Sequence, residues 1–169
     1  MMSRRNTLFG IGAISAALVG LRSLFTSAPA QAAQPVQAAH TYEVAHTETE
    51  WQKLLSREQF QVLRQAGTER PGSSPLNKEK RAGTFTCAGC ALPLFSSKTK
   101  FESGTGWPSF WQSLDKAVVE EADTTLFMKR VEVLCRRCGG HLGHVFDDGP
   151  KPTGLRYCMN GVSLNFTSA

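Results

Sequence analysis

Residues 131–146 have the sequence VEVLCRRCGGHLGHVF, and they indicate the fold more directly than any other stretch. Val131 and Val133 alternate with Arg130 and Glu132, as expected of a strand with one face buried. HLGHVF is a second short run with strand character, and the turn CRRCGG lies between the two. The stretch therefore predicts two strands connected by a turn that carries cysteines.

Similar runs occur on both sides and are separated by glycine, proline and aspartate. From Thr84 to the end of the chain no helical periodicity is visible. We therefore expect a mainly β domain of antiparallel strands. The expected strands are GTFTC, KAVVEEAD, TTLFMKRVEVLC, HLGHVF, LRYCMN and VSLNF.

Helical signals precede these strands, in residues 47–69 with the sequence TETEWQKLLSREQFQVLRQAGTE. Thr49 and Gln52 have the spacing of one capping box, and Ser56 and Gln59 have the spacing of another. The segment therefore predicts helix at the start of the domain.

The N-terminus has the layout of a bacterial export signal. Arg4 and Arg5 precede an uncharged apolar run, residues 8–21, and small residues follow it. The paired arginines favour the twin-arginine route to the periplasm, and the alternatives are an ordinary secretory signal or an uncleaved N-terminal anchor. We expect a signal peptide (1–33), a linker (34–46) and one domain (47–169).

The whole chain has a formal charge of +5, but residues 1–33 hold three arginines and no acidic residue. Without that segment, 16 basic residues stand against 14 acidic ones, which leaves a charge of +2. The sequence has no stripe rich in lysine or arginine. Nucleic acid is therefore not an expected partner.

Four of the five cysteines form two CxxC units separated by 44 residues. A two-residue gap in a tight turn lets both thiolates face one ion, and Gly89 and Gly139 suit such turns. Four thiolates complete a tetrahedral shell without an open position, which predicts one structural zinc ion. The expected ligands are Cys87, Cys90, Cys135 and Cys138.

Two other interpretations of these cysteines are open. An exported protein would permit two disulfides. A thioredoxin-like redox motif is the third interpretation, although it is expected once and in a βαβ setting that this sequence lacks. The doubled CxxC arrangement favours the metal site over both.

Cys158 remains outside this shell. Arg156 and Asn160 lie two positions to either side of it, so the three side chains would share one face of a strand. A guanidinium beside a thiol favours the thiolate, which is the reactive form. The alternative is an inert buried cysteine, and the residues alone leave both interpretations open.

Two histidines, His141 and His144, follow the second CxxC unit and could transfer a proton near neutral pH. Alternatively, His141 is a spare zinc ligand, or either histidine is a solvated loop residue. Asp147 and Asp148 could orient a histidine or Arg156, or could be ordinary turn residues.

The stretch KFESGTGWPSFWQSL, residues 100–114, contains a loop that displays an aromatic ring. Trp107 follows two closely spaced glycines and precedes a proline. Its ring could form an apolar cradle for a methyl group or a thioether. The alternative is a packed cluster with Phe110 and Trp111.

Four stretches resemble the type B peptide methionine sulfoxide reductases, which act on the R epimer of methionine sulfoxide. They are CAGCALPLF, KFESGTGWPSFWQ, VLCRRCGGHLGHVFDDGP and RYCMNGVSLNF, in the order of the family and across most of residues 47–169. The resemblance implies a mainly β fold of two antiparallel sheets with short N-terminal helices.

The same resemblance implies roles for individual positions. Cys158 would be the catalytic nucleophile, and the paired cysteines match the structural zinc ligands of many members. Trp107 would hold the methyl group of the substrate. The other positions that match the active site are His141, His144, Asn160, Arg156 and Asp148.

The chain departs from the family at Thr105, where many members place a resolving cysteine. With four cysteines on zinc, no thiol remains to form an internal disulfide with Cys158. We expect Cys158 to take the oxygen as a sulfenic acid while a histidine protonates it, and an external thiol to reduce that acid. The expected partners of this monomer are oxidised proteins or peptides and a thioredoxin-like or small-thiol reductant.

Two rival functions come from other classes. A zinc-ribbon binding module would explain the paired cysteines but would leave Cys158, His141 and Trp107 without a role. A thiol–disulfide oxidoreductase would act through CAGC or CRRC, and its activity would depend on Cys87 rather than on Cys158.

Overall fold

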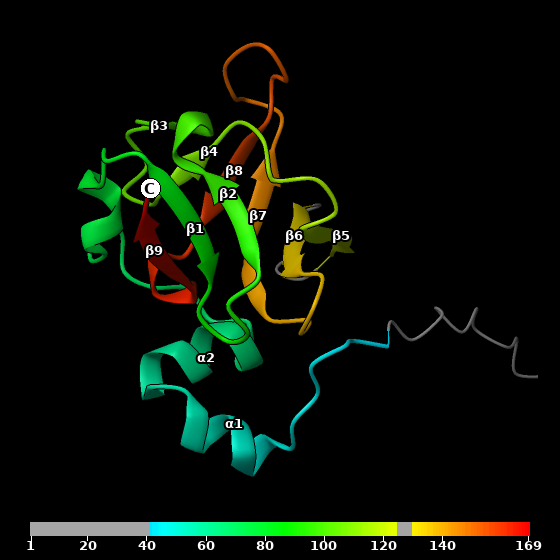
Figure 1. Ribbon diagram of the computed structural model, residues 1–169. Helices are drawn as coiled ribbons and strands as arrows, with labels where there is room; N and C mark the ends of the chain where they lie inside the picture. Colours follow the sequence, from blue (N-terminus) through cyan, green and yellow to red (C-terminus); the bar gives the residue numbers. More distant parts are fainter. Residues whose placement is uncertain (1–40, 125–129) are drawn as a thin grey trace, which may run out of the picture. The chain divides into compact units, whose positions relative to one another are not determined.

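The computed structural model describes residues 41–124 and 130–169 (Figure 1). The predicted signal peptide, most of the predicted linker and part of the expected strand TTLFMKRVEVLC lie outside these ranges. Within them, no helix is both long enough and apolar enough to cross a membrane.

Two short α-helices and several 3-10 turns precede or connect the strands. The helices are α1 (Glu48–Leu54) and α2 (Arg57–Gln65), and the 3-10 turns named below are η1 (Pro75–Lys78) and η4 (Gly161–Ser163). Ser56 and Gln59 form the capping box predicted for α2. This reciprocal pair satisfies backbone N–H groups at the first turn of the helix.

The start of α1 differs from the prediction. Its capping box is formed by Thr47 and Glu50, whereas Thr49 and Gln52 lie inside the helix. The Thr47 hydroxyl accepts from the Glu50 N–H, and the Glu50 carboxylate accepts from the Thr47 N–H. Both threonines have a suitable partner three residues on, but Thr47 is the residue with the extended backbone of an N-cap.

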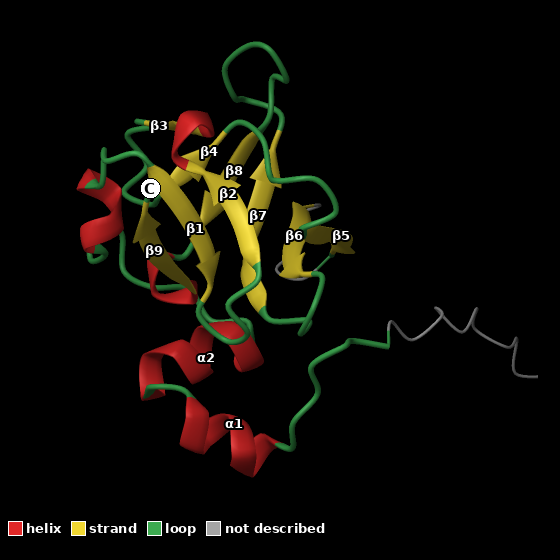
Figure 2. Cartoon of the chain, viewed as in Figure 1, coloured by secondary structure: helices red, strands yellow, loops and turns green. Residues whose placement is uncertain are grey.

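Nine strands in the described ranges form two antiparallel sheets (Figure 2), which confirms the expected mainly β fold. The three-stranded sheet has the order β2 (Pro93–Ser96), β1 (Gly83–Cys87), β9 (Leu164–Ser168). The six-stranded sheet has the order β3 (Lys100–Phe101), β4 (Ser109–Phe110), β8 (Arg156–Met159), β7 (His141–Phe146), β6 (Arg130–Cys135), β5 (Val118–Asp123).

The two sheets pack through buried aromatic side chains. Phe110 from the six-stranded sheet stacks on Phe95 at 4.4 Å between ring centroids and meets Phe85 edge-on at 4.9 Å. All three rings are fully buried. Burial of each ring contributes about 1.5–3 kcal/mol. These contacts therefore hold the sheets together where Phe110 on β4 pairs with Tyr157 on β8.

Val131 is an exception to the predicted alternation in β6. Val133 is fully buried, but Val131 is 37% exposed. Both side chains lie on the same face of the strand, so the difference arises from position along it. The core reaches Val133 and does not extend to the start of β6.

Candidate active site and metal centre

The two CxxC units form matching turns, one between β1 and β2 and the other between β6 and β7. The Ala91 N–H donates to the Cys87 carbonyl, and the Gly139 N–H donates to the Cys135 carbonyl, each at 2.8 Å. Ala91 (φ 59°) and Gly139 (φ 66°) are left-handed in the equivalent position. Gly139 thus has the predicted role, whereas in the first turn that position falls on Ala91 rather than on Gly89.

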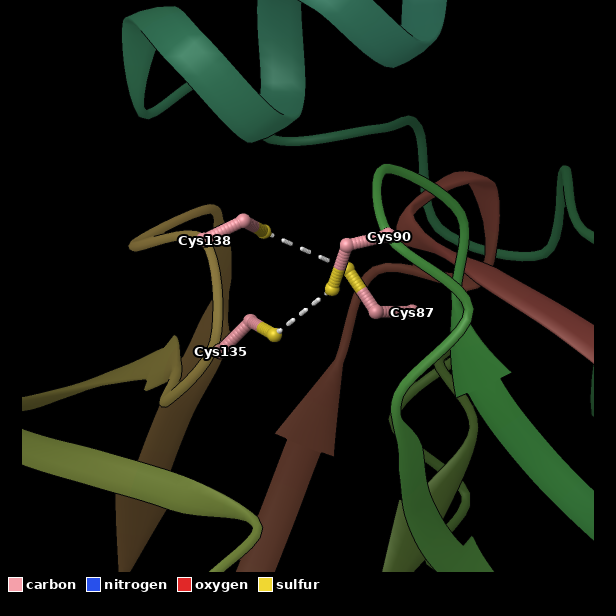
Figure 3. Close-up of side chains that lie close together, drawn as sticks. All are labelled: Cys87, Cys90, Cys135 and Cys138. Atoms are coloured by element: carbon pink, nitrogen blue, oxygen red, sulfur yellow. Dashed lines mark hydrogen bonds between the residues drawn. The ribbon is translucent and has the colours of Figure 1, made fainter. Parts of the chain in front are cut away.

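The four sulfur atoms of these turns face one another (Figure 3) and all lie within 4.8 Å of one another. Cys87 and Cys138 are 3.7 Å apart at Sγ, and Cys90 and Cys135 are 3.5 Å apart. Tetrahedral zinc with bonds of about 2.3 Å would separate its sulfur ligands by about 3.8 Å. A disulfide requires about 2.05 Å, and all five cysteines are free. The cluster therefore fits a tetrahedral metal ion rather than two disulfides.

Cys158 lies in the middle of the six-stranded sheet, on β8 between β4 and β7. Its cross-strand partners are Ser109 on β4 and His144 on β7, and the partner of His144 on β6 is Glu132. Directly paired residues project to the same face, with Cβ atoms about 4.5–5.5 Å apart. A single row of side chains therefore carries the half-buried Cys158 thiol next to an imidazole.

Each histidine is held by a carboxylate that the sequence did not suggest. His144 Nε2 lies 2.9 Å from Asp123 Oδ2, and that oxygen also accepts from Arg130 at 2.7 Å. His141 Nδ1 lies 2.5 Å from a Glu132 carboxylate oxygen, and the two imidazole rings are 5.5 Å apart. Burial lowers the pKa of His141 below its ordinary value, although Glu132 acts in the opposite direction. His141 is therefore favoured in its neutral form.

A bidentate ion pair fixes Arg156 beside Cys158. Its Nε and Nη2 atoms donate to the two Asp148 carboxylate oxygens at 2.8 and 2.9 Å, and the guanidinium lies 4.4 Å from the Phe146 ring centroid. Asp148 is the main cause that raises the pKa of Arg156, and the neighbouring Cys158 also raises it. Asp147 and Asp148 are both exposed, but the Asp148 carboxylate is the one that pairs with Arg156. Of the two aspartates, Asp148 is therefore the one that orients Arg156.

Asn160 is buried and lies just beyond β8, which ends at Met159. Its Oδ1 atom accepts from the Glu69 N–H at 2.9 Å, and its Nδ2 atom donates to the Leu142 carbonyl at 3.1 Å. The amide therefore ties the segment before η1 to β7 beside the row that contains Cys158.

Glu69 fixes several parts of the site at once. Its carbonyl accepts from the Trp107 indole N–H at 3.2 Å, and its carboxylate accepts from the N–H groups of Gly161 and Val162 at 2.7 and 2.9 Å. A groove of about 1200 Å³ between α2 and β9 is lined by Glu69 and Val162, but not by Cys158. The convergence of functional groups, rather than the size of a groove, therefore locates the site.

Thr105 also reaches the site, because its hydroxyl oxygen lies 3.8 Å from Cys158 Sγ. Gly106, with φ 93°, packs against Pro71, and a side chain at that position would collide with it. The loop thus needs glycine to bring Thr105 and Trp107 to their places. Trp107, the predicted substrate-binding residue, therefore belongs to the same loop as Thr105, which contacts the Cys158 thiol.

Known proteins are similar to this chain over the residues that form the site. A family model described as the SelR domain matches residues 55–168. The peptide methionine sulfoxide reductase MsrB of Methanosarcina barkeri is 62% identical over 122 residues, which cover 71% of this chain and 85% of that protein. MsrB proteins of Methanosarcina mazei and Pseudomonas putida are 59% and 57% identical, over 72% and 71% of this chain and 87% and 91% of theirs. The chain therefore belongs to the SelR-domain family, together with the type B peptide methionine sulfoxide reductases that it matches.

Proposed function

We propose that this protein reduces methionine-R-sulfoxide in proteins or peptides to methionine, with Cys158 as the nucleophile. The observation that carries the proposal is the direct pairing of Cys158 with His144 across β7 and β8, beside the Arg156 guanidinium. A cation favours the thiolate, and an imidazole can supply a proton. The relatives named MsrB support the reaction class.

The first step transfers one oxygen atom and two electrons. The Cys158 thiolate attacks the sulfoxide sulfur, the oxygen is protonated and moves to the cysteine, and methionine leaves. Cys158 is oxidised to a sulfenic acid while the substrate sulfur is reduced. Trp107, fixed by Glu69, would hold the methyl group of the substrate.

His144 is the proposed proton donor. It lies directly opposite Cys158, and the contact of its Nε2 atom with Asp123 fixes the position of its ring. His141 suits this role less well, because burial lowers its pKa and because it is not the cross-strand partner of Cys158. Its proposed role is to support the position of the neighbouring His144 ring.

An external thiol is the proposed reductant. The other four cysteines form the four-sulfur cluster. Thr105 occupies the place next to Cys158 where a resolving thiol would be needed. One thiol would attack the sulfenic acid and release water, and a second would release the mixed disulfide. A thioredoxin-like protein or a small thiol has the required chemistry.

One zinc ion per chain is the proposed occupant of the four-sulfur cluster. Cys87, Cys90, Cys135 and Cys138 would hold it, and the Gly89 N–H already donates to Cys87 Sγ at 3.4 Å. The ion would supply structural stability only, since four thiolates leave no open position.

Export through the twin-arginine route and a monomeric state complete the proposal. The support for export is the sequence of residues 1–33, with Arg4 and Arg5 before the apolar run. Mass spectrometry of periplasmic protein should show a chain that begins near residue 33, and size-exclusion chromatography should give the mass of one chain. Retention of the full chain in the membrane fraction would favour the uncleaved anchor instead.

The decisive experiment is an activity assay with R and S sulfoxide peptides and dithiothreitol as reductant. Wild type should reduce the R form, and Cys158→Ser should not. Without reductant, wild type should gain one oxygen on Cys158 and react with dimedone. No turnover of either epimer would contradict the proposal, and insulin reduction that requires Cys87 but not Cys158 would favour the rival oxidoreductase.

A further inference from the structure

Three hydroxyl groups form a chain that leads away from Cys158. Thr105 Oγ1 lies 3.8 Å from Cys158 Sγ and 2.8 Å from Ser103 Oγ, which in turn lies 2.7 Å from Ser109 Oγ. Ser109 Oγ donates to the Trp107 carbonyl at 3.1 Å. Ser109 is fully buried and is the cross-strand partner of Cys158, so the chain starts and ends beside the same strand pair.

When Cys158 is a thiol, only one direction of this chain makes all four contacts as hydrogen bonds. Each hydroxyl has one hydrogen to donate, and the Trp107 carbonyl can only accept. Because Ser109 donates to that carbonyl, Ser103 must donate to Ser109, and Thr105 must donate to Ser103. The last contact is then completed by the Cys158 S–H, which donates to Thr105.

Loss of the thiol proton reverses that direction. A thiolate can only accept, so the Thr105 hydroxyl must turn toward sulfur, Ser103 must donate to Thr105, and Ser109 must donate to Ser103. Every hydroxyl keeps a partner. The single bond that is lost is the one from Ser109 to the Trp107 carbonyl, the longest of the three oxygen–oxygen contacts. In exchange, the chain gains a hydrogen bond to a charged acceptor, which is the stronger kind.

We propose that Thr105 is a catalytic residue that donates a hydrogen bond to the Cys158 thiolate, and that Ser103 and Ser109 form a reversible hydroxyl chain that supports it. The inference rests on the proposed role of Cys158 as the nucleophile. Thr105 thus has a role of its own at the position where many relatives would have a resolving cysteine. Its hydroxyl stabilises the thiolate form of Cys158, whose sulfur it contacts.

The hydroxyl chain acts on the side of Cys158 that carries no charge. Residues 103–110, which include β4 and the loop before it, contain no ionisable side chain. Glu69 approaches from the segment before η1, where its carboxylate accepts from the N–H groups of Gly161 and Val162. The other charged and titratable groups of the site approach from β8, β7, the loop after β7 and the strands beyond. They are Arg156 with Asp148, His144 with Asp123, and His141 with Glu132.

The test measures alkylation of Cys158 by iodoacetamide as a function of pH, in the full-length protein as isolated. Mass spectrometry of the peptide that contains Cys158 separates its rate from that of the other cysteines. Thr105→Val keeps the shape of the side chain and removes the hydroxyl, so its profile should move to higher pH by about one unit, with about tenfold slower alkylation on the acidic side. Thr105→Ser keeps the donor and should stay within about twofold of wild type.

Ser109→Ala gives a prediction of opposite sign. It removes the link to the Trp107 carbonyl that holds the chain in its thiol direction, while Thr105 and Ser103 can still donate toward the sulfur. Alkylation should therefore become faster, by about threefold at acidic pH. A merely structural disturbance of the site would slow both variants. If Thr105→Val matches wild type, or if Ser109→Ala slows alkylation as Thr105→Val does, the inference is wrong.

Thr86→Val on β1 is the matched control, since it makes the same substitution in the other sheet and should leave the profile unchanged. An equal shift in that control would overturn the local explanation. If Thr105→Val fails to fold, the Ser109→Ala profile still decides the question, because the inference expects faster alkylation and a structural disturbance would slow it. Alkylation requires no sulfoxide, so a wild type that reduces no R sulfoxide would refute the proposed function without changing this measurement.

Discussion

At the scale of single residues, we expect position 105 to decide how an oxidised Cys158 would be reduced. Thr105 Oγ1 lies 3.8 Å from Cys158 Sγ, between Gly104 (φ 74°) and Gly106 (φ 93°), so Thr105→Cys would place a second sulfur near the first in a loop with adaptable backbone. After treatment with R sulfoxide and no reductant, this variant should contain an internal disulfide and no dimedone-reactive cysteine. Wild type should show the reverse, and a stable sulfenic acid in the variant would contradict the geometry.

The two histidines should differ in their effect on the chemical step. General acid catalysis contributes about 10²–10⁴-fold, and His144, unlike His141, is the direct cross-strand partner of Cys158. His144→Ala should therefore lower the single-turnover rate by about that factor, and His141→Ala should lower it less. Quenched-flow measurement of methionine release compares them. A larger loss in His141→Ala would assign the proton to His141.

At the scale of elements, the contact of β7 with β8 depends on Gly143. A Cβ atom there would collide with the Cys158 carbonyl and crowd Met159. Gly143→Ala should push the strands apart at Cys158, with a loss of about 1–3 kcal/mol of stability and more than about tenfold in kcat/KM. Urea unfolding and the R-sulfoxide assay measure the two losses.

Gly154→Ala provides the matched control for that substitution. Gly154 also has a positive φ, 74°, but nothing lies within 4 Å of its Cβ position. Its cost should be limited to the backbone, about 1–2 kcal/mol, and its activity should be close to that of wild type. Equal losses of activity in both variants would show that backbone strain, rather than the strand contact, explains the Gly143 result.

The sequence predicted those elements whose pattern is long enough to see. Strands β1, β5, β6, β7 and β8 lie within the expected runs, and β9 overlaps the last of them. Strand β2 was not expected, and β3 and β4 have two residues each, too few for an alternation to be recognised. Motif spacing located the cysteines, the histidines and Trp107. Asp123 and Glu132 could not be found in this way, because their contacts depend on the register of β5, β6 and β7, including a shift after Val133.

At the scale of the whole molecule, the two CxxC turns join the two sheets. The first turn belongs to the three-stranded sheet and the second to the six-stranded sheet, so the four-sulfur cluster connects them at one end. The chain before α1 adds to this junction, since Glu43 pairs with Arg136 at 2.7 Å and the Val44 N–H donates to the Arg137 carbonyl at 3.0 Å. Strand β7 begins at His141, three residues after Cys138, so the second turn also fixes the position of the strand that carries both histidines.

Stability should depend on pH through His141. Burial lowers its pKa in the folded chain below the ordinary value of about 6.5, so the unfolded chain binds more protons between the folded pKa and about pH 6.5. The free energy of unfolding should therefore fall as pH decreases through this window, and His141→Gln should reduce the fall. Urea titrations at about pH 7.5 and about pH 6 measure both proteins. Equal slopes would show that His141 does not contribute.

Metal removal tests the junction directly. If one ion links the sheets, the folded chain should lose several kcal/mol when a strong chelator removes it, and the melting temperature should fall by more than about 10 °C. Helices α1 and α2 should loosen as well, because Trp51 and Leu63 belong to the same buried core cluster as Cys87 and Cys138. Cys158→Ser should bind one zinc by elemental analysis and melt like wild type, whereas Cys135→Ser should behave like the chelated protein. An unchanged melting temperature after complete removal would mean that the aromatic core alone holds the sheets together, and that the four sulfurs have another use.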